Sequence, residues 1–436
     1  MQNGRKKKSV NRKADAGAKR SEQSGRTKRN LIITAVLFVG AAGLSILGKK
    51  KAFADWYCET VYRRVAAAVG SLTSLVPFSI AEILLYAMIV FVVVTLVQIV
   101  RAIVMGVAAC GKTTNDKYEE AGEHGVSGNG TGGAVENRDK PMKRIPMYLS
   151  RLVLVAAILA FLYVANCGIL YNRTSFAEQE GFAEVVEAQE QLTQEERTEI
   201  LKNLCIYLVR QVNAESEAAH VVADADTGDE ADQRDVQLSD GPATWQSQCK
   251  AAREALTALQ DDYDTLEGYV AYPKYLVVSR MLSVQQVTGV YSPFTIEANV
   301  NREIPAYNIP FTMCHELSHL LGFMEEQEAN FIAFLACSGS DDAWLRYAGN
   351  LYGFVYAGNA LNRTDPEAYS EVRAMLNETA LEELHENNLF WDRFEGKVSE
   401  AHDNLNDAYL KANGQEEGII SYSRVVELMM AWYAEA

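Results

Sequence analysis

Residues 311–330 read FTMCHELSHLLGFMEEQEAN, and this stretch decides how the second half of the chain folds. It contains the pattern HExxH, formed by His315, Glu316 and His319, and Pro310 just before it favours the start of a helix. On a helix the two histidines lie one turn apart on the same face. Two imidazoles can then bind one Zn²⁺ ion, with Glu316 offset so that it can act as a general base on a zinc-bound water.

The third protein ligand of such a site has two candidates, because hydrolytic zinc sites use three protein ligands and keep one position open. The spacing HExxHxxGxxE assigns the role to Glu325, after a turn at Gly322. Alternatively, residues 326–330 (EQEAN) resemble the ExxA[DN] segment with which glutamate zincins supply a ligand from a second helix. We favour Glu326, because Gly322 can end the first helix in a left-handed turn and a second helix can return a carboxylate to the metal. Glu325 and Glu328 are then expected to be solvated acids or outer neighbours of the ligands.

Two simpler explanations of the motif compete with zinc binding. The chain has six histidines, and an HExxH pattern arises by chance in about one such sequence per hundred. The pair could also be two core histidines of an amphipathic helix, since the apolar neighbours Met313, Leu317 and Leu320 suit both explanations. The glutamates that follow directly after the motif favour zinc.

Charge is distributed unevenly along the 436 residues. Residues 1–168 carry 24 of the 41 Lys and Arg residues but only 11 of the 57 Asp and Glu residues. A basic half that flanks apolar segments is typical of membrane orientation, and an acidic half is typical of a domain that does not bind nucleic acid. We therefore expect a lipid bilayer, and no nucleic acid, among the partners.

Three apolar runs are long enough to cross a bilayer, namely residues 31–48, 80–100 and 152–170. The first follows a basic head, residues 1–30, and is either a signal anchor or a cleavable signal peptide. Three lysines, residues 49–51, separate it from the cleavage-like residues 52–54, which favours the anchor. The sequence therefore predicts a multi-pass protein of the cell membrane.

The loops next to these runs predict the orientation of the chain. Positive charge gathers in the head, in residues 101–117 and in residues 140–151, and such short loops stay in the cytoplasm. With three spans, residues 171–436 then form an extracytoplasmic domain. We expect residues 108–145 to be a flexible cytoplasmic loop, because residues 122–134 are rich in glycine.

The predicted domain, residues 171–436, is of the α+β class and mostly helical, with a zincin-like arrangement around the motif. Residues 275–280 and 289–300 are rich in β-forming side chains and predict a small sheet. By analogy with other peptidases, residues 294–300 could offer an edge strand to an extended peptide. Residues 214–242 are acidic and poor in apolar side chains, so we expect a disordered insertion there.

The seven cysteines are scattered and contain no CxxC pair, so they predict neither a disulfide framework nor a cysteine-rich zinc site. Cys205 and Cys249 could form a disulfide if the domain is extracytoplasmic. The alternative is that both are buried free thiols.

Further motifs occur along the chain: the basic head, PFSIAE (77–82), GVYSPFTIEANVN (289–301), CHELSH (314–319), EANFIAFLAC (328–337) and YLKANGQ (409–415), the last followed by a glycine at 418. Together they resemble a bacterial membrane-protein family called domain of unknown function 3810, over nearly the whole chain. That family is similar to gluzincin peptidases in its HExxH pattern and following glutamate. The resemblance implies a membrane-anchored, zinc-dependent metallopeptidase with a peptide or protein substrate.

Two classes of function remain open. In a metallopeptidase, Glu316 would transfer a proton, and a transition-state donor is expected, with Tyr347, Tyr352 and His385 as candidates. Alternatively, the chain is a membrane sensor or scaffold in which the zinc, or the helix pair alone, is structural. A structural zinc site needs no general base, so the presence of Glu316 favours the enzyme.

Overall fold

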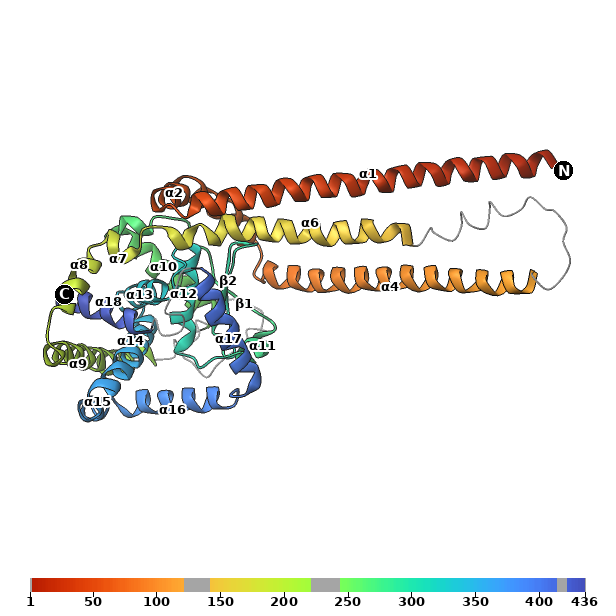
Figure 1. Cartoon of the computed structure of the whole chain (residues 1–436). Coiled ribbons are helices and arrows are strands. Elements are labelled where there is room, and N and C mark those ends of the chain that lie inside the picture. The colour runs from red at the N-terminus through yellow and green to blue at the C-terminus, as the bar shows by residue number, and fades with distance from the viewer. Residues whose placement is uncertain (1, 121–141, 221–243, 414–421, 436) are drawn as a thin grey trace, which may run out of the picture. The chain divides into compact units, whose positions relative to one another are not determined.

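The structure, a computed structural model, describes residues 2–120, 142–220, 244–413 and 422–435. It is mostly helical with one small sheet, as the sequence predicts (Figure 1). The chain divides into two compact units. One, the helical unit, consists of Met1–Leu44 and Ile83–Val164; the other, the compact domain, consists of Ser45–Glu82 and Ala165–Ala436.

Three long helices run through the helical unit: α1 (Gln2–Gly48), α4 (Ile80–Glu120) and α6 (Ile145–Tyr163). By length and composition, the stretches Ser21–Gly48, Ile80–Val107 and Ile145–Asn172 could each cross a membrane. Large apolar side chains on them are open to the surroundings, with Val39 73% and Val107 63% exposed. Apolar surface of this extent is unfavourable in water and suits lipid. The protein is therefore membrane-associated through three apolar helices.

The predicted loop over residues 108–145 is wrong at both ends. Helix α4 continues to Glu120, a 3₁₀ turn covers Met142–Arg144, and α6 begins at Ile145. Residues 101–120 contain no proline that would break a helix. The unfavourable step of helix nucleation has already taken place in the apolar stretch before them, so the helix can continue. The glycine-rich residues 122–134 lie outside the described residues.

The compact domain starts earlier in the chain than residue 171, because it includes residues 45–82, which the sequence assigns to the membrane region. The carboxylate of Asp55 accepts hydrogen bonds from the backbone N–H and the hydroxyl of Thr174, both at 2.7 Å. The hydroxyl of buried Tyr62 donates to the carbonyl of Leu320 at 2.8 Å. These contacts join segments that lie more than a hundred residues apart, so local patterns cannot reveal them.

In the compact domain, helix α12 packs against strands β2 and β3 of the small sheet. Helix α9 packs along α14, and α13 packs against α12, α14 and α18. In chain order the elements are α2 (Lys51–Tyr57), the π-helix η1 (Cys58–Tyr62), α3 (Arg63–Thr73), the π-helix η3 (Val164–Gly168), η4 (Leu170–Asn172), α7 (Phe176–Gln179), α8 (Phe182–Glu190), α9 (Gln194–Ala219), α10 (Trp245–Asp262), η5 (Asp264–Leu266), β1 (Lys274–Tyr275), α11 (Ser279–Val284), β2 (Gly289–Ser292), β3 (Glu297–Val300), α12 (Asn308–Leu320), α13 (Glu326–Ser338), α14 (Ala343–Thr364), α15 (Pro366–Arg373), α16 (Glu378–Asp392), α17 (Lys397–Ala412) and α18 (Tyr422–Glu435).

The sheet has the strand order β1-β3-β2. Strand β3 pairs with β1 in parallel and with β2 in antiparallel fashion, so it is the central strand. The prediction that residues 294–300 form an edge strand is therefore wrong. Strand order depends on pairing with residues 274–275, which the local alternation of residues 289–300 does not encode. The two edges belong to β1 and β2.

The predicted disordered insertion also begins too early. Residues 214–219 form the last turns of α9, where Ser216 is buried and Glu215 forms an ion pair with Arg346 at 2.8 Å. Tertiary contacts thus stabilise a stretch whose composition alone suggests disorder. Residues 221–243 lie outside the described residues. Cys205 and Cys249 are buried free thiols, which confirms the second of the two alternatives for this pair.

Candidate metal centre

Helix α12 carries the HExxH pattern, with Pro310 in its first turn. The helix ends in a left-handed turn at Gly322, whose φ is +98°. The N–H of Phe323 donates to Ser318 O at 3.2 Å and the N–H of Gly322 donates to His319 O at 2.9 Å. This pair of bonds is the Schellman pattern, which favours glycine at the left-handed position. Gly322 therefore ends the helix as the sequence predicts.

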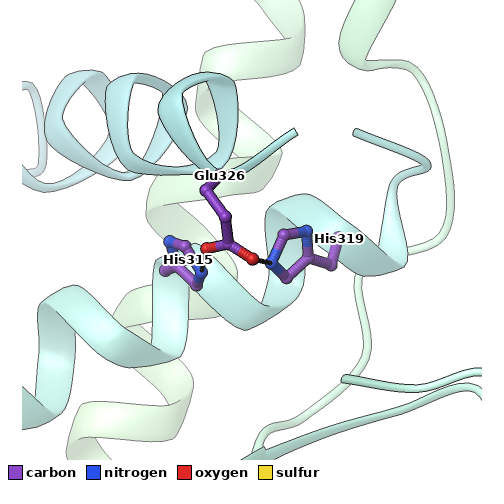
Figure 2. Close-up of side chains that lie close together, drawn as sticks. All are labelled: His315, His319 and Glu326. Carbon is purple, nitrogen blue, oxygen red and sulfur yellow. Dashed lines mark ion pairs between the residues drawn. The ribbon is translucent and has the colours of Figure 1, made fainter. Parts of the chain in front are cut away.

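The chain turns back at once, because α13 begins only four residues after Gly322. Its first residue, Glu326, points its carboxylate between the two imidazole rings of α12 (Figure 2). The distance from His315 Nε2 to Glu326 Oε2 is 3.3 Å, and that from His319 Nε2 to Glu326 Oε1 is 3.7 Å. The potential ligand atoms of all three residues lie within 4.8 Å of one another. The structure thus brings together the three residues that the sequence predicts as metal ligands.

The backbone beyond the turn orients one of the imidazoles. His319 Nδ1 lies 2.7 Å from the carbonyl oxygen of Phe323. Because a carbonyl oxygen only accepts hydrogen bonds, Nδ1 carries the hydrogen when the ring is neutral. Nε2 is then left with a free lone pair, directed at Glu326. Metal-binding histidines commonly have an outer partner of this kind.

Burial and mutual charge set the protonation of the metal-free cluster. Burial lowers the pKa of His315, but the hydrogen bond and charge of Glu326 outweigh it, so the net shift is upward. Burial and the neighbouring charge of His315 lower the pKa of His319 to about 4. Burial opposes ionisation of Glu326, yet the two imidazoles lower its pKa to about 2. Without metal, His315 and Glu326 therefore share an ion pair while His319 is neutral.

Glu316 lies beside this cluster without a complete set of partners. Its Oε2 atom is buried and has no hydrogen-bond partner among the described residues. A Cβ atom at Gly289 of strand β2 would come within 2.5 Å of Glu316 Oε1, so only glycine leaves room for the carboxylate there. Burial raises the pKa of Glu316 to about 8, with His315 opposing and Glu326 adding to the shift. A nearby cation would oppose that shift, because it stabilises the charged form.

The other two candidate glutamates have different neighbours. Glu325 accepts a hydrogen bond from the side chain of Gln327 at 2.8 Å. Glu328 accepts one from the backbone N–H of Ala177 at 3.2 Å and is only 4% exposed, so it is a buried acid, and of its two predicted roles the solvated one is wrong. Burial, with the charge of Glu325 adding, raises its pKa to about 8. Its engagement with α7 leaves Glu326 as the glutamate that lies between the histidines.

Among the three candidate transition-state donors, Tyr347 and Tyr352 contact residues outside the cluster, and His385 is exposed. The hydroxyl of Tyr347 donates to Glu383. The ring of Tyr352 stacks on Phe311 with 4.0 Å between centroids and 4° between planes. His385 is exposed on α16. Of the three, His385 is a potential metal ligand, and it does not belong to the cluster of His315, His319 and Glu326 in the described part of the chain.

One aromatic neighbour of the cluster was not predicted. The ring of Tyr291, on β2, lies 6.4 Å from that of His319, centroid to centroid. Its buried hydroxyl is 2.9 Å from the hydroxyl of Tyr62 and 3.3 Å from the carbonyl of Asn166, and Tyr62 in turn bonds to Leu320. Tyr291 thus positions the end of α12. The alternation of residues 289–292 could have predicted this position of Tyr291, because every second residue of a strand points to the same face of the sheet.

These residues fit a zinc ion. Two imidazoles and one carboxylate form a donor set that hydrolytic Zn²⁺ sites use. His319 already presents an unprotonated nitrogen, and the unpaired Oε2 of Glu316 lies next to the cluster. An unsatisfied buried carboxylate oxygen is costly in a folded protein, and its retention beside a ligand set is typical of a functional centre.

Comparison with known protein families places most of the chain in one family. A family model described as "Protein of unknown function (DUF3810)" matches residues 57–430. No curated protein and no solved structure matches the chain. The matched region contains Tyr62 and both helices of the candidate metal centre, α12 and α13.

Proposed function

We propose that this chain, which belongs to the DUF3810 family, is a membrane-anchored, zinc-dependent metallopeptidase. The observation that carries the proposal is the convergence of His315, His319 and Glu326 beside the unpaired carboxylate oxygen of Glu316. His315, His319 and Glu326 would hold the ion. Zinc, when bound there, would supply Lewis-acid polarisation of the scissile carbonyl.

Glu316 is the general base of the proposed reaction. Its Oε2 takes a proton from the attacking water and passes that proton to the leaving amine. In the metal-free protein the pKa of about 8 keeps this carboxyl group protonated near neutral pH. Positive charge at the cluster lowers the pKa again and makes the carboxylate available as a base.

The substrate of the proposed reaction is a peptide in extended form. Strand β2 forms an edge of the sheet, and its Gly289 lies directly against Glu316. The free edge of a strand can pair with an added peptide strand through main-chain hydrogen bonds. A peptide bound along β2 would pass beside the proposed general base.

The proposed topology is multi-pass, with the compact domain outside the cytoplasm. Residues 45–82 follow the first apolar helix and residues 165–436 follow the third, and both belong to the compact domain. Three crossings put these two segments on the same side of the membrane, and the basic loops favour the cytoplasm for the opposite side. Cysteine labelling of intact cells should reach position 240 and not position 128. The opposite labelling pattern would invert the topology.

The function is tested with the full-length protein, because a fragment that begins at residue 171 would lack Tyr62 and its bond to Leu320. We expect wild-type protein to cleave a mixed peptide library and Glu316→Gln to be slower by roughly 10²- to 10⁴-fold, the usual contribution of a general base. Metal content should be unchanged, since the amide keeps the shape of the side chain. Glu325→Gln is the matched control, because it makes the same change outside the cluster. Equal cleavage by wild type and Glu316→Gln would rule out the mechanism.

A further inference from the structure

The sheet that borders the metal centre has two different faces. On one face, Gly289 and Tyr291 of β2 lie against Glu316 and His319 of α12. Side chains alternate between faces along a strand, so Val290 points to the opposite face. Val290 pairs with Asn299 of β3, which places Asn299 on that second face as well. One layer of backbone therefore separates the two faces.

The second face is attached to the residues at which the second apolar helix begins. The carboxylate of Glu297, two residues from Asn299 on β3, accepts hydrogen bonds from the N–H groups of Ile80 at 3.1 Å and Ala81 at 2.7 Å. In return, the carboxylate of Glu82 accepts hydrogen bonds from the backbone N–H groups of Val277 at 2.8 Å and Val278 at 3.0 Å. The candidate span Ile80–Val107 thus starts directly on this face of the sheet.

The end of the third apolar helix is attached to the same sheet. The side chain of Asn166 donates to the carbonyl of Pro293 at 2.8 Å. Pro293 lies in the turn between β2 and β3, and the candidate span Ile145–Asn172 includes Asn166. Within the compact domain, the first residues of one candidate span and the last residues of another are therefore bonded to the small sheet.

Large apolar side chains are exposed around these two attachment points. We call them the apolar rim: Leu75 (78% exposed), Phe78 (47%), Val277 (66%), Met281 (60%), Val290 (45%) and Phe294 (41%). Five of them lie within a few positions along the chain of a residue that takes part in the hydrogen bonds of Glu82, Glu297 or Pro293. The sixth, Val290, lies on the same face of the sheet as Glu297. A gathered set of exposed apolar side chains marks an interaction surface.

We propose that the apolar rim docks on the surface of the lipid bilayer, and that the substrates are peptide segments next to a membrane anchor. The bilayer is the occupant because the rim residues lie near Ile80, Glu82 and Asn166 along the chain or through the sheet bonds to them, and these three residues belong to two candidate membrane spans. Strand β2, at one edge of the sheet, then lies at the membrane interface, with the candidate metal centre one backbone layer away. The proposal that the rim docks on the bilayer depends only on the small sheet and its hydrogen bonds to residues of the two candidate spans. The proposal about the substrate rests in addition on the proposed function.

Docking is tested by attaching nitroxide labels to single cysteines in full-length protein, reconstituted in vesicles of phosphatidylethanolamine and phosphatidylglycerol. A Cys110→Ser background is suitable because the other six cysteines are buried. Labels at Val277, Met281 and Phe294 should collide more with oxygen, which dissolves in lipid, than with a water-soluble nickel chelate. Leu389 on α16, at 52% exposure, is the matched control and should show the reverse. Nickel access at the rim equal to that at Leu389 would overturn the docking proposal, and shielding from both reagents would assign the rim to a protein partner.

The substrate class is tested in the same vesicles with a mixed peptide library, with and without an acyl anchor. Confinement to the bilayer raises the effective concentration at a docked site, so anchored peptides should be cleaved faster, on the order of 100-fold. Met281→Asp should reduce this advantage without changing cleavage of free peptides, while Leu389→Asp should change neither. Equal rates for anchored and free peptides would overturn the substrate class. Cleavage of neither library would overturn the peptidase itself, and the nitroxide labels would still decide the docking.

Discussion

Two clusters of charge lie on opposite faces of the small sheet, and they are built differently: the first is buried, whereas in the second the side chain of Glu326 is 36% exposed. In the first, Lys274 and Glu297 form an ion pair at 2.5 Å, and Glu297 also accepts hydrogen bonds from the backbone N–H groups of Ile80 and Ala81. Lys274 Nζ has a second bond, to the carbonyl of Thr73 at 2.7 Å. In the second, His315, His319 and Glu326 approach at 3.3 and 3.7 Å, and Glu316 keeps a buried oxygen without a partner among the described residues.

The difference teaches how a structural charge cluster can be distinguished from a functional one. Burial of charge is costly unless hydrogen bonds complete the coordination of each group. The Lys274–Glu297 pair is complete in this sense and connects β1, β3 and the start of α4. The cluster of His315, His319 and Glu326 is incomplete in this sense, and under the proposed function a cation would complete it by replacing the proton of His315. We therefore expect mutations in the first cluster to change stability and mutations in the second to change metal binding.

The largest expected effect is on stability, in Lys274→Met. This change leaves the carboxylate of Glu297 buried without its cation, which typically costs about 3–5 kcal/mol. The free energy of unfolding in detergent, measured with denaturant, should fall by that amount, while zinc content of the folded protein stays the same.

Lys250→Met is the matched control for Lys274→Met. Lys250 is 68% exposed and forms a loose pair with Glu254 at 3.8 Å, so its loss should cost at most about 1 kcal/mol. If Lys274→Met were as mild as Lys250→Met, the Lys274–Glu297 cluster would not be a structural one. A loss of zinc in folded Lys274→Met would show that the two clusters are not separate.

The next effect concerns metal affinity, measured by competition with a chelator. Glu326→Gln removes a ligand charge, so it should weaken zinc binding by more than the roughly 10- to 100-fold typical of an outer partner. Glu328→Gln should have little effect, because Glu328 faces Ala177. Retention of zinc by Glu326→Gln together with its loss in Glu325→Gln would support the HExxHxxGxxE assignment and contradict ours.

A smaller change in zinc affinity is expected when the pH is raised from about 6.5 to 8. His315 and Glu316 both have raised pKa values, the latter about 8, and zinc must displace these protons. Zinc affinity should therefore rise with pH, about tenfold per unit for each proton displaced. In the metal-free protein, the stability of the fold changes with pH in the opposite direction. Raised pKa values favour the folded state at low pH, and this contribution to stability is lost as the pH rises through those pKa values. Zinc affinity that does not change with pH would contradict the assigned protonation of the cluster.

The sequence predicted those parts of the centre that depend on local spacing. The i, i+4 relation of His315 and His319, the left-handed turn at Gly322 and the start of a second helix at Glu326 all lie within about a dozen residues. Helical geometry and one glycine determine them, so no knowledge of the rest of the fold was needed.

The remaining parts depend on contacts between distant residues. The bond from Tyr62 to Leu320 joins positions 258 residues apart, and Tyr291 reaches Asn166 over 125 residues. The central position of β3 requires β1, which no alternation within residues 289–300 reveals. For the same reason, residues 45–82 were assigned to the membrane region although they support the end of α12.

The central claim is that the incomplete cluster binds zinc, and elemental analysis of the full-length protein tests it most directly. Protein purified without chelator should contain close to one zinc per chain, because two imidazoles and the Glu326 carboxylate form a three-ligand site. His315→Ala, purified in parallel, should contain almost none. Wild-type protein without zinc, or equal zinc in wild type and His315→Ala, would contradict the claim.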